Sequence, residues 1–373
     1  MITAELAQKM VEEYYSMESN LDKGIMIAAC QGKREYICKD ILSSDIPKFL
    51  NDYINTPEMQ KQAGISVTCG TCYSKLFNTT LWYSSLDHSV AVALIVWNFT
   101  KDKKQTISAL LHDIATPVFK HCIDYMNGDY ENQESTEDLT TKIIADSKEL
   151  MSLLDRDGIK LEEVCDYHMY PIADNDTPRL AADRLEYTFS NGMGVRINFW
   201  NLNEIKEIYN NIEVQTNEDG LPELGFKDLK LAEKFVNIMS KLSSSYISSQ
   251  TKYTMELLAI IMKKMSSRNL ITVKDLYTLS EKEVIEKIEN CNYDKISESF
   301  NIWKNATQIY ESDEIVKNKY CIELKGKMRY IVPLVKQDNQ YIRINELSES
   351  ANADINRALN FKTKKYAYLD FDF

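Results

Sequence analysis

Apolar residues recur at helical spacing along most of this chain. Between residues 81 and 99 the apolar side chains Val90, Ala91, Leu94, Ile95 and Val96 form one buried helical side. Further helices are predicted over residues 106–114, 160–168, 177–190 and 272–289. Another helix is predicted to begin at a cap formed by residues 135–138 and to end at about residue 154. Residues 201–265 are predicted to be mostly helical, with a turn at 217–222. The hydrophobic pattern therefore predicts a mainly helical fold.

Strand patterns are predicted mainly near the end of the chain. They cover residues 320–324, 329–335, 341–345 and 365–370, with a further strand-like stretch at 32–38 in an otherwise helical start. The polar residues 127–137 predict a mobile loop over a functional site. We expect an N-terminal helical segment (1–45), a helical core (46–265) and a C-terminal helical and β region (266–373).

Composition indicates an ordinary globular protein. Of 373 residues, 44% are apolar and 27% are charged, and no apolar run approaches the 18 residues of a membrane span. The first residues form an acidic amphipathic pattern, unlike a signal peptide, so we expect the eight cysteines to be reduced thiols in the cytoplasm. Cys69-Gly-Thr-Cys72 lacks a second ligand pair nearby, which favours a turn with two incidental thiols over a zinc or redox site.

The formal net charge of −12 argues against general electrostatic binding to nucleic acid. A local basic pocket for a small nucleotide remains compatible with this charge. Neither a membrane nor nucleic acid is therefore expected as a partner.

Three of the four histidines lie between residues 86 and 124. His88 lies in one predicted helix, the adjacent pair His112-Asp113 ends the next helix, and a third helix begins after Pro117. Imidazole and carboxylate groups together suit a borderline divalent metal such as Mn, Fe, Co, Ni or Zn. A metal held in this way polarises a phosphoryl oxygen and lowers the pKa of bound water. Core histidines that make one hydrogen bond each are the alternative.

With Asp183 far downstream, this arrangement resembles the HD superfamily of metal-dependent phosphohydrolases. Asn55-Thr-Pro-Glu-Met-Gln-Lys61 is similar to a phrase that precedes the first metal histidine in its deoxynucleoside triphosphate triphosphohydrolase (dNTPase) branch. The resemblance covers at least residues 46–191. It implies a mostly α fold, with an HD-domain helical core and a small mixed α/β C-terminal region. It also implies a divalent metal ion (Mn, Fe, Co, Ni, Zn or Mg) with the ligands His88, His112, Asp113 and Asp183.

The resemblance also implies roles for the residues around this metal. His121 and Asp124 match a family phrase with acid-base function, and their spacing lets the carboxylate orient the imidazole. A surface histidine paired with an aspartate is the alternative. Asp113 would also orient the attacking water. The residues expected to contact substrate are Arg184 and Lys120 at phosphate, Tyr187 near sugar and base, and Asn191 near the ribose. For Lys120, a solvated helix lysine is the favoured interpretation.

Three departures from the dNTPase pattern each remove a positive or proton-carrying group. Thr116 and Thr136 stand where the family has histidines, and Ser85 stands where it has an arginine. His168 either lines the pocket as a partial replacement or has no role there. The sequence thus predicts a dNTPase-like phosphohydrolase acting on a nucleotide or related phosphate ester.

Two other hypotheses stay open. One is a catalytically weak or inactive nucleotide-binding regulatory HD protein, and the other is a helical interaction protein whose histidines are structural. The resemblance further implies a homo-oligomer.

Overall fold

The computed structural model describes residues 41–77, 79, 82–129, 139–194 and 199–370. Its helices are α3 (Lys48–Ile54), α4 (Pro57–Lys61), α5 (Ser85–Thr100), α6 (Lys103–Leu111), α7 (Cys122–Asn127), α8 (Thr140–Asp146), α9 (Lys148–Asp157), α10 (Ala182–Gly192), α11 (Leu202–Asn210), α12 (Leu229–Tyr246), α13 (Ser249–Ser267), α14 (Val273–Thr278), α15 (Glu281–Glu289), α16 (Asp294–Asn305), α17 (Ile344–Leu347) and α18 (Glu349–Leu359). Short 3₁₀ helices are η2 (Gln62–Gly64), η3 (Thr71–Tyr73), η4 (Leu161–Glu163) and η5 (Tyr167–Met169).

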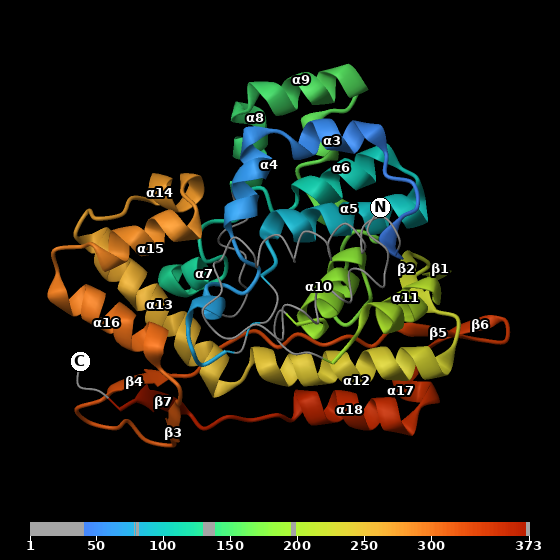
Figure 1. The fold of residues 1–373 in the computed structure, drawn as a ribbon. Helices are drawn as coiled ribbons and strands as arrows, with labels where there is room; N and C mark the ends of the chain where they lie inside the picture. The colour runs from blue at the N-terminus through green and yellow to red at the C-terminus, as the bar shows by residue number, and fades with distance from the viewer. Residues whose placement is uncertain (1–40, 78, 80–81, 130–138, 195–198, 371–373) are drawn as a thin grey trace.

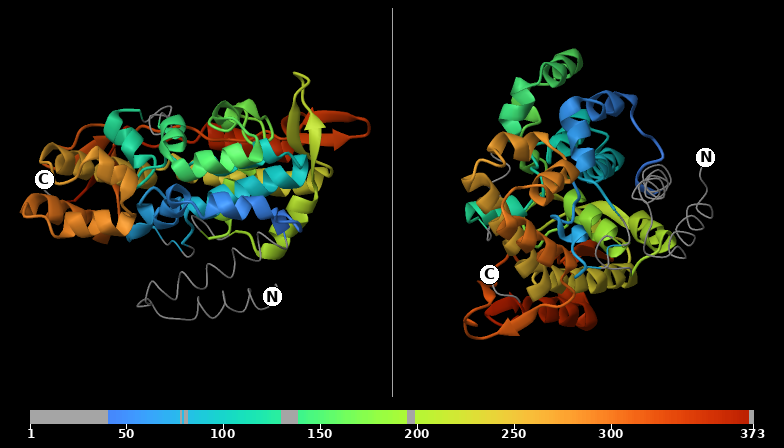
Figure 2. Two further views of the ribbon diagram at one scale, coloured as in Figure 1. Left: turned by 90° about the horizontal axis from the view of Figure 1, so that it is seen from above. Right: turned by 60° about the vertical axis from the view of Figure 1, so that its left-hand side comes forward.

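The strands form two small sheets. One sheet has the order β1 (Ile212–Thr216), β2 (Pro222–Phe226), β5 (Leu334–Gln337) and β6 (Gln340–Arg343), with β2 and β5 parallel and the other pairs antiparallel. The other sheet is antiparallel, with the order β3 (Tyr310–Ser312), β7 (Tyr366–Leu369) and β4 (Tyr320–Glu323). The two sheets lie at opposite ends of the molecule (Figure 1, Figure 2). The predicted mostly helical fold with a small mixed region is confirmed.

Helices α5 and α6 form an antiparallel pair at the centre of the fold. A capping box between Ser84 and Asp87 starts α5, and its apolar run is buried on nearly all sides. Lys101 ends the helix in a left-handed conformation, and the Asp102 carboxylate immediately accepts a hydrogen bond from Gln105 N–H to start α6. Because only two residues connect them, the start of α5 lies beside the end of α6.

Two hydrophobic clusters form the interior. The larger one contains residues of α5, α6, α10, α11 and α12 and of strands β1, β2 and β5. The smaller one contains α7, α13, α14, α15, α16 and residues of β4 and β7. Among the described residues no helix is long and apolar enough to cross a bilayer. The domain boundaries expected from the sequence stay a prediction.

The prediction of mostly helix over 201–265 is wrong at β1 and β2, which form a hairpin around the predicted turn. Two interior positions of this hairpin carry polar residues. Gln215 is buried and donates a hydrogen bond to Phe226 O (2.9 Å), and the buried Glu223 pairs with Arg343 (2.6 Å). A strand is normally predicted from alternating apolar and polar residues, and here polar residues occupy buried positions. Their partners lie far along the chain or across the hairpin, so the sequence does not show that these polar side chains are buried.

Other element boundaries also differ from the predictions. The helix expected over 160–168 is replaced by η4 and η5, since the Asp166 carboxylate accepts a hydrogen bond from His168 N–H and Pro171 follows. Ser147 divides the helix expected up to 154 into α8 and α9. Of the strand expected over 329–335, only its end joins a sheet, because Pro333 has no N–H to donate. The predictions for 1–40 and 135–138, and most of the predicted loop 127–137, lie outside the described residues.

Candidate metal centre and active-site pocket

The antiparallel packing of α5 and α6 brings two histidines together. His88 lies in the first turn of α5, and His112 is the residue that ends α6. Their rings pack edge to face with centroids 5.1 Å apart. His88 and His112 are 24 residues apart in the sequence, and they meet because α5 and α6 run antiparallel.

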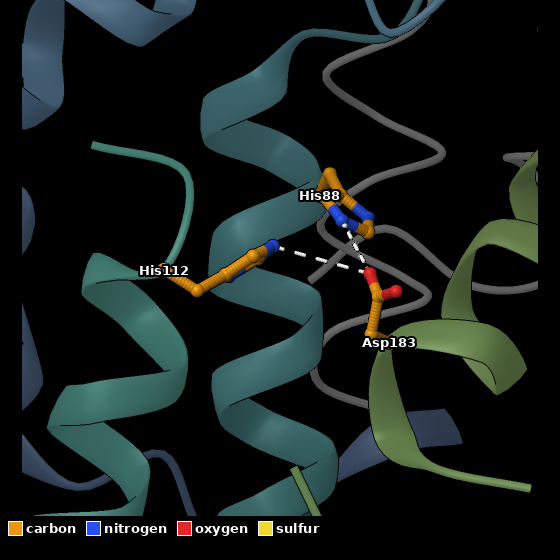
Figure 3. A group of neighbouring side chains, drawn as sticks. All are labelled: His88, His112 and Asp183. Carbon is orange, nitrogen blue, oxygen red and sulfur yellow. Dashed lines mark ion pairs between the residues drawn. The ribbon is translucent and has the colours of Figure 1, made fainter. Parts of the chain in front are cut away.

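Asp183 joins them from α10, which packs against α5. The Asp183 N–H donates to Ala173 O (3.2 Å), which fixes the start of α10. The carboxylate Oδ1 lies 3.0 Å from His88 Nε2 and 3.9 Å from His112 Nε2 (Figure 3). The three side chains each offer one ligand atom, and these atoms lie within 4.8 Å of one another. The structure thus brings together three of the four predicted metal ligands.

Glu186 supports this cluster, and the sequence analysis missed it. Its carboxylate pairs with His88 Nδ1 and accepts a hydrogen bond from the Tyr83 hydroxyl (2.8 Å). His112 Nδ1 donates to Ala109 O (2.7 Å). Both rings therefore have their Nδ1 atoms engaged away from the centre and present Nε2 toward Asp183. Glu186 follows Asp183 by three residues on the same helix face, which is the clue that the sequence offered.

The donor chemistry of the cluster fits a divalent cation. Burial lowers the pKa of His88, but Glu186 and Asp183 outweigh burial and raise it to about 10. Burial raises the pKa of Asp183, whereas His88, His112 and Arg184 outweigh it and hold that pKa below its ordinary value. A proton shared by these groups is what a cation would displace, because metal ligands must be deprotonated. Two imidazole nitrogens and one carboxylate oxygen suit a borderline metal.

Asp113, the fourth predicted ligand, lies beside this cluster but faces a different partner. Its Oδ2 atom is 3.8 Å from His112 Nε2, and it accepts hydrogen bonds from Lys120 Nζ (2.5 Å) and Ser85 Oγ (3.1 Å). Burial raises the pKa of Asp113, but Lys120, His112 and His88 outweigh burial and keep it well below its ordinary value. Its role as a ligand stays a prediction.

Lys120 reaches the pocket through a left-handed turn. Both Phe119 and Lys120 have positive φ angles, 64° and 45°, which is a conformation that side-chain-bearing residues seldom adopt. The Lys120 side chain is 11% exposed. A solvated helix lysine, the interpretation favoured from the sequence, is therefore wrong.

His121 and Asp124 lie where their spacing predicted. His121 precedes the first residue of α7, and its Nδ1 lies 2.9 Å from Asp124 Oδ2. Its other nitrogen, Nε2, lies 3.4 Å from Nη2 of Arg329. Burial lowers the pKa of His121, and the charges of Arg329 and Lys120 lower it further against the effect of Asp124.

The predicted substrate contacts line the same pocket. Arg184 pairs with Asp174 Oδ1 (2.9 Å) and donates to Asn175 Oδ1 (2.7 Å). Tyr187 faces into the pocket, and burial raises its pKa to about 12. Asn191 donates to Tyr187 O (2.7 Å) one helical turn earlier. Their substrate roles stay predictions.

His168 also reaches the pocket wall, at its exposed rim. Its Nε2 lies 3.4 Å from Asp174 Oδ2, and Asp174 in turn pairs with Arg184. Its side chain is 53% exposed. His168 therefore extends a chain of charged groups outward from the site.

The pocket itself has a volume of about 220 Å³ and lies where the two hydrophobic clusters meet. Its lining includes the His88, His112 and Asp183 cluster, and also His121 and Met255. Tyrosines and cations form much of the remaining lining, namely Tyr125, Tyr167, Tyr187, Tyr246, Lys120, Arg184, Lys327 and Arg329. Lys327 and Arg329 were missed from the sequence, although Lys325-Gly-Lys-Met-Arg329 is a basic cluster in an acidic chain.

Fold and site thus define a helical protein with a candidate metal centre in a pocket lined by charged side chains of both signs. In sequence it is 25% identical to an uncharacterized Bacillus subtilis protein, YdhJ, over 289 residues, which cover 76% of this chain and 83% of that protein. It is 26% identical to the metal-dependent phosphohydrolase cns2 of Cordyceps militaris over 143 residues, which cover 37% of this chain and 39% of that protein. No family model matches the sequence.

Two solved structures share the fold. One is a hypothetical protein from Aquifex aeolicus, with a TM-score of 0.59 and 15% identity, covering 87% of this chain and 93% of that chain. The other is a phosphohydrolase from Bacteroides thetaiotaomicron, with a TM-score of 0.59 and 13% identity, covering 87% of this chain and 96% of that chain. The helical architecture around the pocket is therefore shared with proteins of known structure.

Proposed function

We propose that this chain is a metal-dependent phosphohydrolase of the dNTPase-like kind, acting on a nucleotide or related phosphate ester. The observation that carries the proposal is the convergence of His88, His112 and Asp183 in a pocket lined by cations. Sequence similarity to a protein named a metal-dependent phosphohydrolase supports it. A cation cluster beside nitrogen and carboxylate ligands suits a substrate that carries phosphate.

His88, His112 and Asp183 would hold the metal, with Asp113 as the fourth proposed ligand. Such a metal, when bound, supplies Lewis-acid polarisation of a phosphoryl oxygen and lowers the pKa of water. Glu186 keeps the His88 ring in the orientation that presents Nε2.

The remaining steps belong to residues of the chain. His121 would transfer a proton from Nε2 to the leaving oxygen, with Asp124 stabilising its charged form through Nδ1. Arg184 and Lys120 would hold the phosphate, and Tyr187 and Asn191 would contact the sugar and base. Lys120 Nζ lies 3.2 Å from Ser85 Oγ, so this lysine supplies a positive charge at the position where the family's arginine is replaced by serine.

The test is metal content together with turnover, comparing wild type with Asp183→Ala. Asp155→Ala, an exposed carboxylate on α9, is the matched control. We expect stoichiometric metal in the wild type and the control, and at least a tenfold loss in Asp183→Ala. Assays of a nucleotide panel with added Mn or Mg, with product identification, should then show release of phosphate or tripolyphosphate that Asp183→Ala lacks.

A regulatory nucleotide-binding protein is the second candidate. The pairing of Asp113 with Lys120 favours it, because a carboxylate held by an ammonium group is less available for chemistry. Bound metal and measurable nucleotide binding without turnover of any nucleotide would select this candidate. Absence of metal from all three proteins would contradict both candidates and favour structural histidines.

A further inference from the structure

Residues 324–333, here called the strap, lead from β4 to β5 and connect the two sheets. Figure 1 shows the strap crossing the molecule beside α12, between the sheets at its two ends. No residue of the strap belongs to a strand. Residues 326–329 instead form part of the pocket wall.

Hydrogen bonds hold the strap on both sides of that wall. Leu324 N–H donates to Lys365 O (2.9 Å), and the Tyr125 hydroxyl donates to Lys325 O (2.9 Å). Beyond the pocket, Val332 N–H donates to Pro178 O (2.8 Å). Gly326, which follows Lys325, passes so close to Tyr125 that a Cβ atom added to it would lie 3.2 Å from the tyrosine hydroxyl oxygen. The middle of the strap is therefore held in place by residues of the surrounding fold.

The held segment directs two cations into the pocket, Lys327 and Arg329. Arg329 Nη2 lies 3.4 Å from His121 Nε2. Because a guanidinium group only donates, Nε2 must accept in this contact, so the ring proton lies on Nδ1 and is donated to Asp124 (2.9 Å). The same guanidinium thus faces the pocket and contacts the nitrogen that would deliver a proton.

We propose that Lys327 and Arg329 form an anion-binding subsite that takes a phosphate oxyanion of the substrate, and that Arg329 positions His121. The role of His121 rests on the proposed function, whereas the subsite rests on the strap alone. A planar guanidinium binds two phosphate oxygens at once, and the adjacent ammonium adds a point charge. On binding, Arg329 exchanges His121 Nε2 for the phosphate. Nε2 is then free to take up a proton from the solvent, which gives an imidazolium that keeps its Nδ1 proton hydrogen-bonded to Asp124 and holds the new proton beside the same phosphate.

The experiment is calorimetric titration of the metal-loaded protein with inorganic phosphate, for wild type, Arg329→Gln, Arg329→Lys and Lys327→Gln. Lys325→Gln is the matched control, because it removes the same charge from the same strap at an exposed side chain that pairs with Glu323. We expect Arg329→Gln to weaken phosphate binding at least tenfold and Lys327→Gln to weaken it severalfold. Arg329→Lys should recover part of the loss, and Lys325→Gln should bind as the wild type does.

Nitrogen-15 spectra of the imidazoles report on His121 separately, and four histidines make assignment practical. In wild type, phosphate should shift the Nε2 resonance of His121, whereas in Arg329→Gln that resonance should already be shifted without phosphate. Thermal melts show whether each variant is folded. If Arg329→Gln is unfolded, the phosphate affinity of Arg329→Lys is compared with that of the wild type instead. Equal phosphate affinity in wild type and a folded Arg329→Gln, or no phosphate binding by wild type at millimolar concentration, would overturn the subsite.

The two proposals fail in different ways. Weakened phosphate binding in Arg329→Gln without turnover of any ester by wild type would leave the subsite standing and refute the hydrolase. Turnover by wild type, with phosphate binding unaffected by Arg329→Gln, would support the hydrolase and refute the subsite.

Discussion

At the scale of single residues, the candidate site depends on atoms that hold the ligands as much as on the ligands. His88 lies between two carboxylates, Glu186 at Nδ1 and Asp183 at Nε2. The Tyr83 hydroxyl fixes Glu186 in turn. A carboxylate behind a ligating histidine sets its tautomer and makes it more basic, so Glu186 should contribute to metal affinity without touching the metal.

We therefore predict that Glu186→Gln lowers metal affinity about 10- to 100-fold while leaving the fold intact. The amide oxygen can still accept from His88 Nδ1, and the amide nitrogen can donate to the Tyr83 hydroxyl, but the negative charge that raises the basicity of the imidazole is gone. Competition with a metal-binding dye measures the change, with the exposed Glu162→Gln as the control. Unchanged affinity in Glu186→Gln would show that the ring orientation does not depend on this charge.

Sequence alone could supply the ligand candidates, but not their partners. His88, His112 and Asp183 stand out because few histidines occur and their helices are strongly patterned. Glu186 looks like any helix glutamate in the sequence, and Arg329 lies far from every motif. Their roles depend on which helix face packs inward and on where the strap runs, and both are properties of the packed molecule.

At the scale of elements, α15 begins with a buried acid. Glu281 is fully buried, and burial raises its pKa to about 8 against the effect of Lys61. Burial also lowers the pKa of Lys61 to about 7. The start of α15 thus lies near the end of α4, where the Lys61 ammonium donates to Thr116 O (2.6 Å).

The expected consequence is a pH-dependent stability. Between the ordinary carboxyl pKa near 4.5 and the raised value near 8, the native protein binds a proton that the unfolded chain has lost. Stability should therefore fall as pH rises through this window, by up to about 1.4 kcal/mol per pH unit. Lys61 acts in the opposite direction above pH 7, since there the unfolded chain binds the extra proton.

Replacing the acid isolates its contribution. We predict that the free energy of unfolding of Glu281→Gln, measured in urea, increases relative to that of the wild type from pH 5.5 to pH 8. Glu286→Gln, an exposed acid on the same helix, should show no such trend. A difference between Glu281→Gln and wild type that stays constant with pH would contradict the raised pKa.

The elements also show why sequence patterns predicted some parts of the fold and missed others. Helices α5 and α6 were predictable because each contains a long run of residues that suit a buried helix and Asp102 caps the second helix. The β1–β2 hairpin was missed because Gln215 and Glu223 occupy buried positions that apolar residues normally fill. Pro333 and the hydrogen bonds of the strap keep residues 329–333 out of the sheet that their composition suggested.

At the scale of the whole molecule, the candidate ligands all lie on helices of the larger hydrophobic cluster, α5, α6 and α10. Other lining residues, Tyr125 of α7 and Met255 of α13, belong to the smaller cluster. Metal binding should therefore stabilise the larger cluster directly.

We predict that Mn at 100 times its dissociation constant stabilises the wild-type fold by about 2.7 kcal/mol, raising Tm by roughly 3 °C. Asp183→Ala should show no such increase, and a chelator should reverse it in the wild type. The measurement is differential scanning calorimetry with and without Mn. An equal increase in Asp183→Ala would place the stabilising metal elsewhere.

The position of the strap also has a consequence for the order in which the protein is made. Arg329 follows Asp183 by about 150 residues, so at ~5–20 residues per second a ribosome needs roughly 7 to 30 s to proceed from one to the other. During that interval the emerging polypeptide already carries the histidines and the aspartate of the candidate metal centre, together with Lys120 and Arg184, while Lys327 and Arg329 of the strap have yet to be synthesised. The residues of the candidate metal centre thus precede the strap in synthesis, and the proposed anion-binding subsite is the last part of the pocket lining to be made.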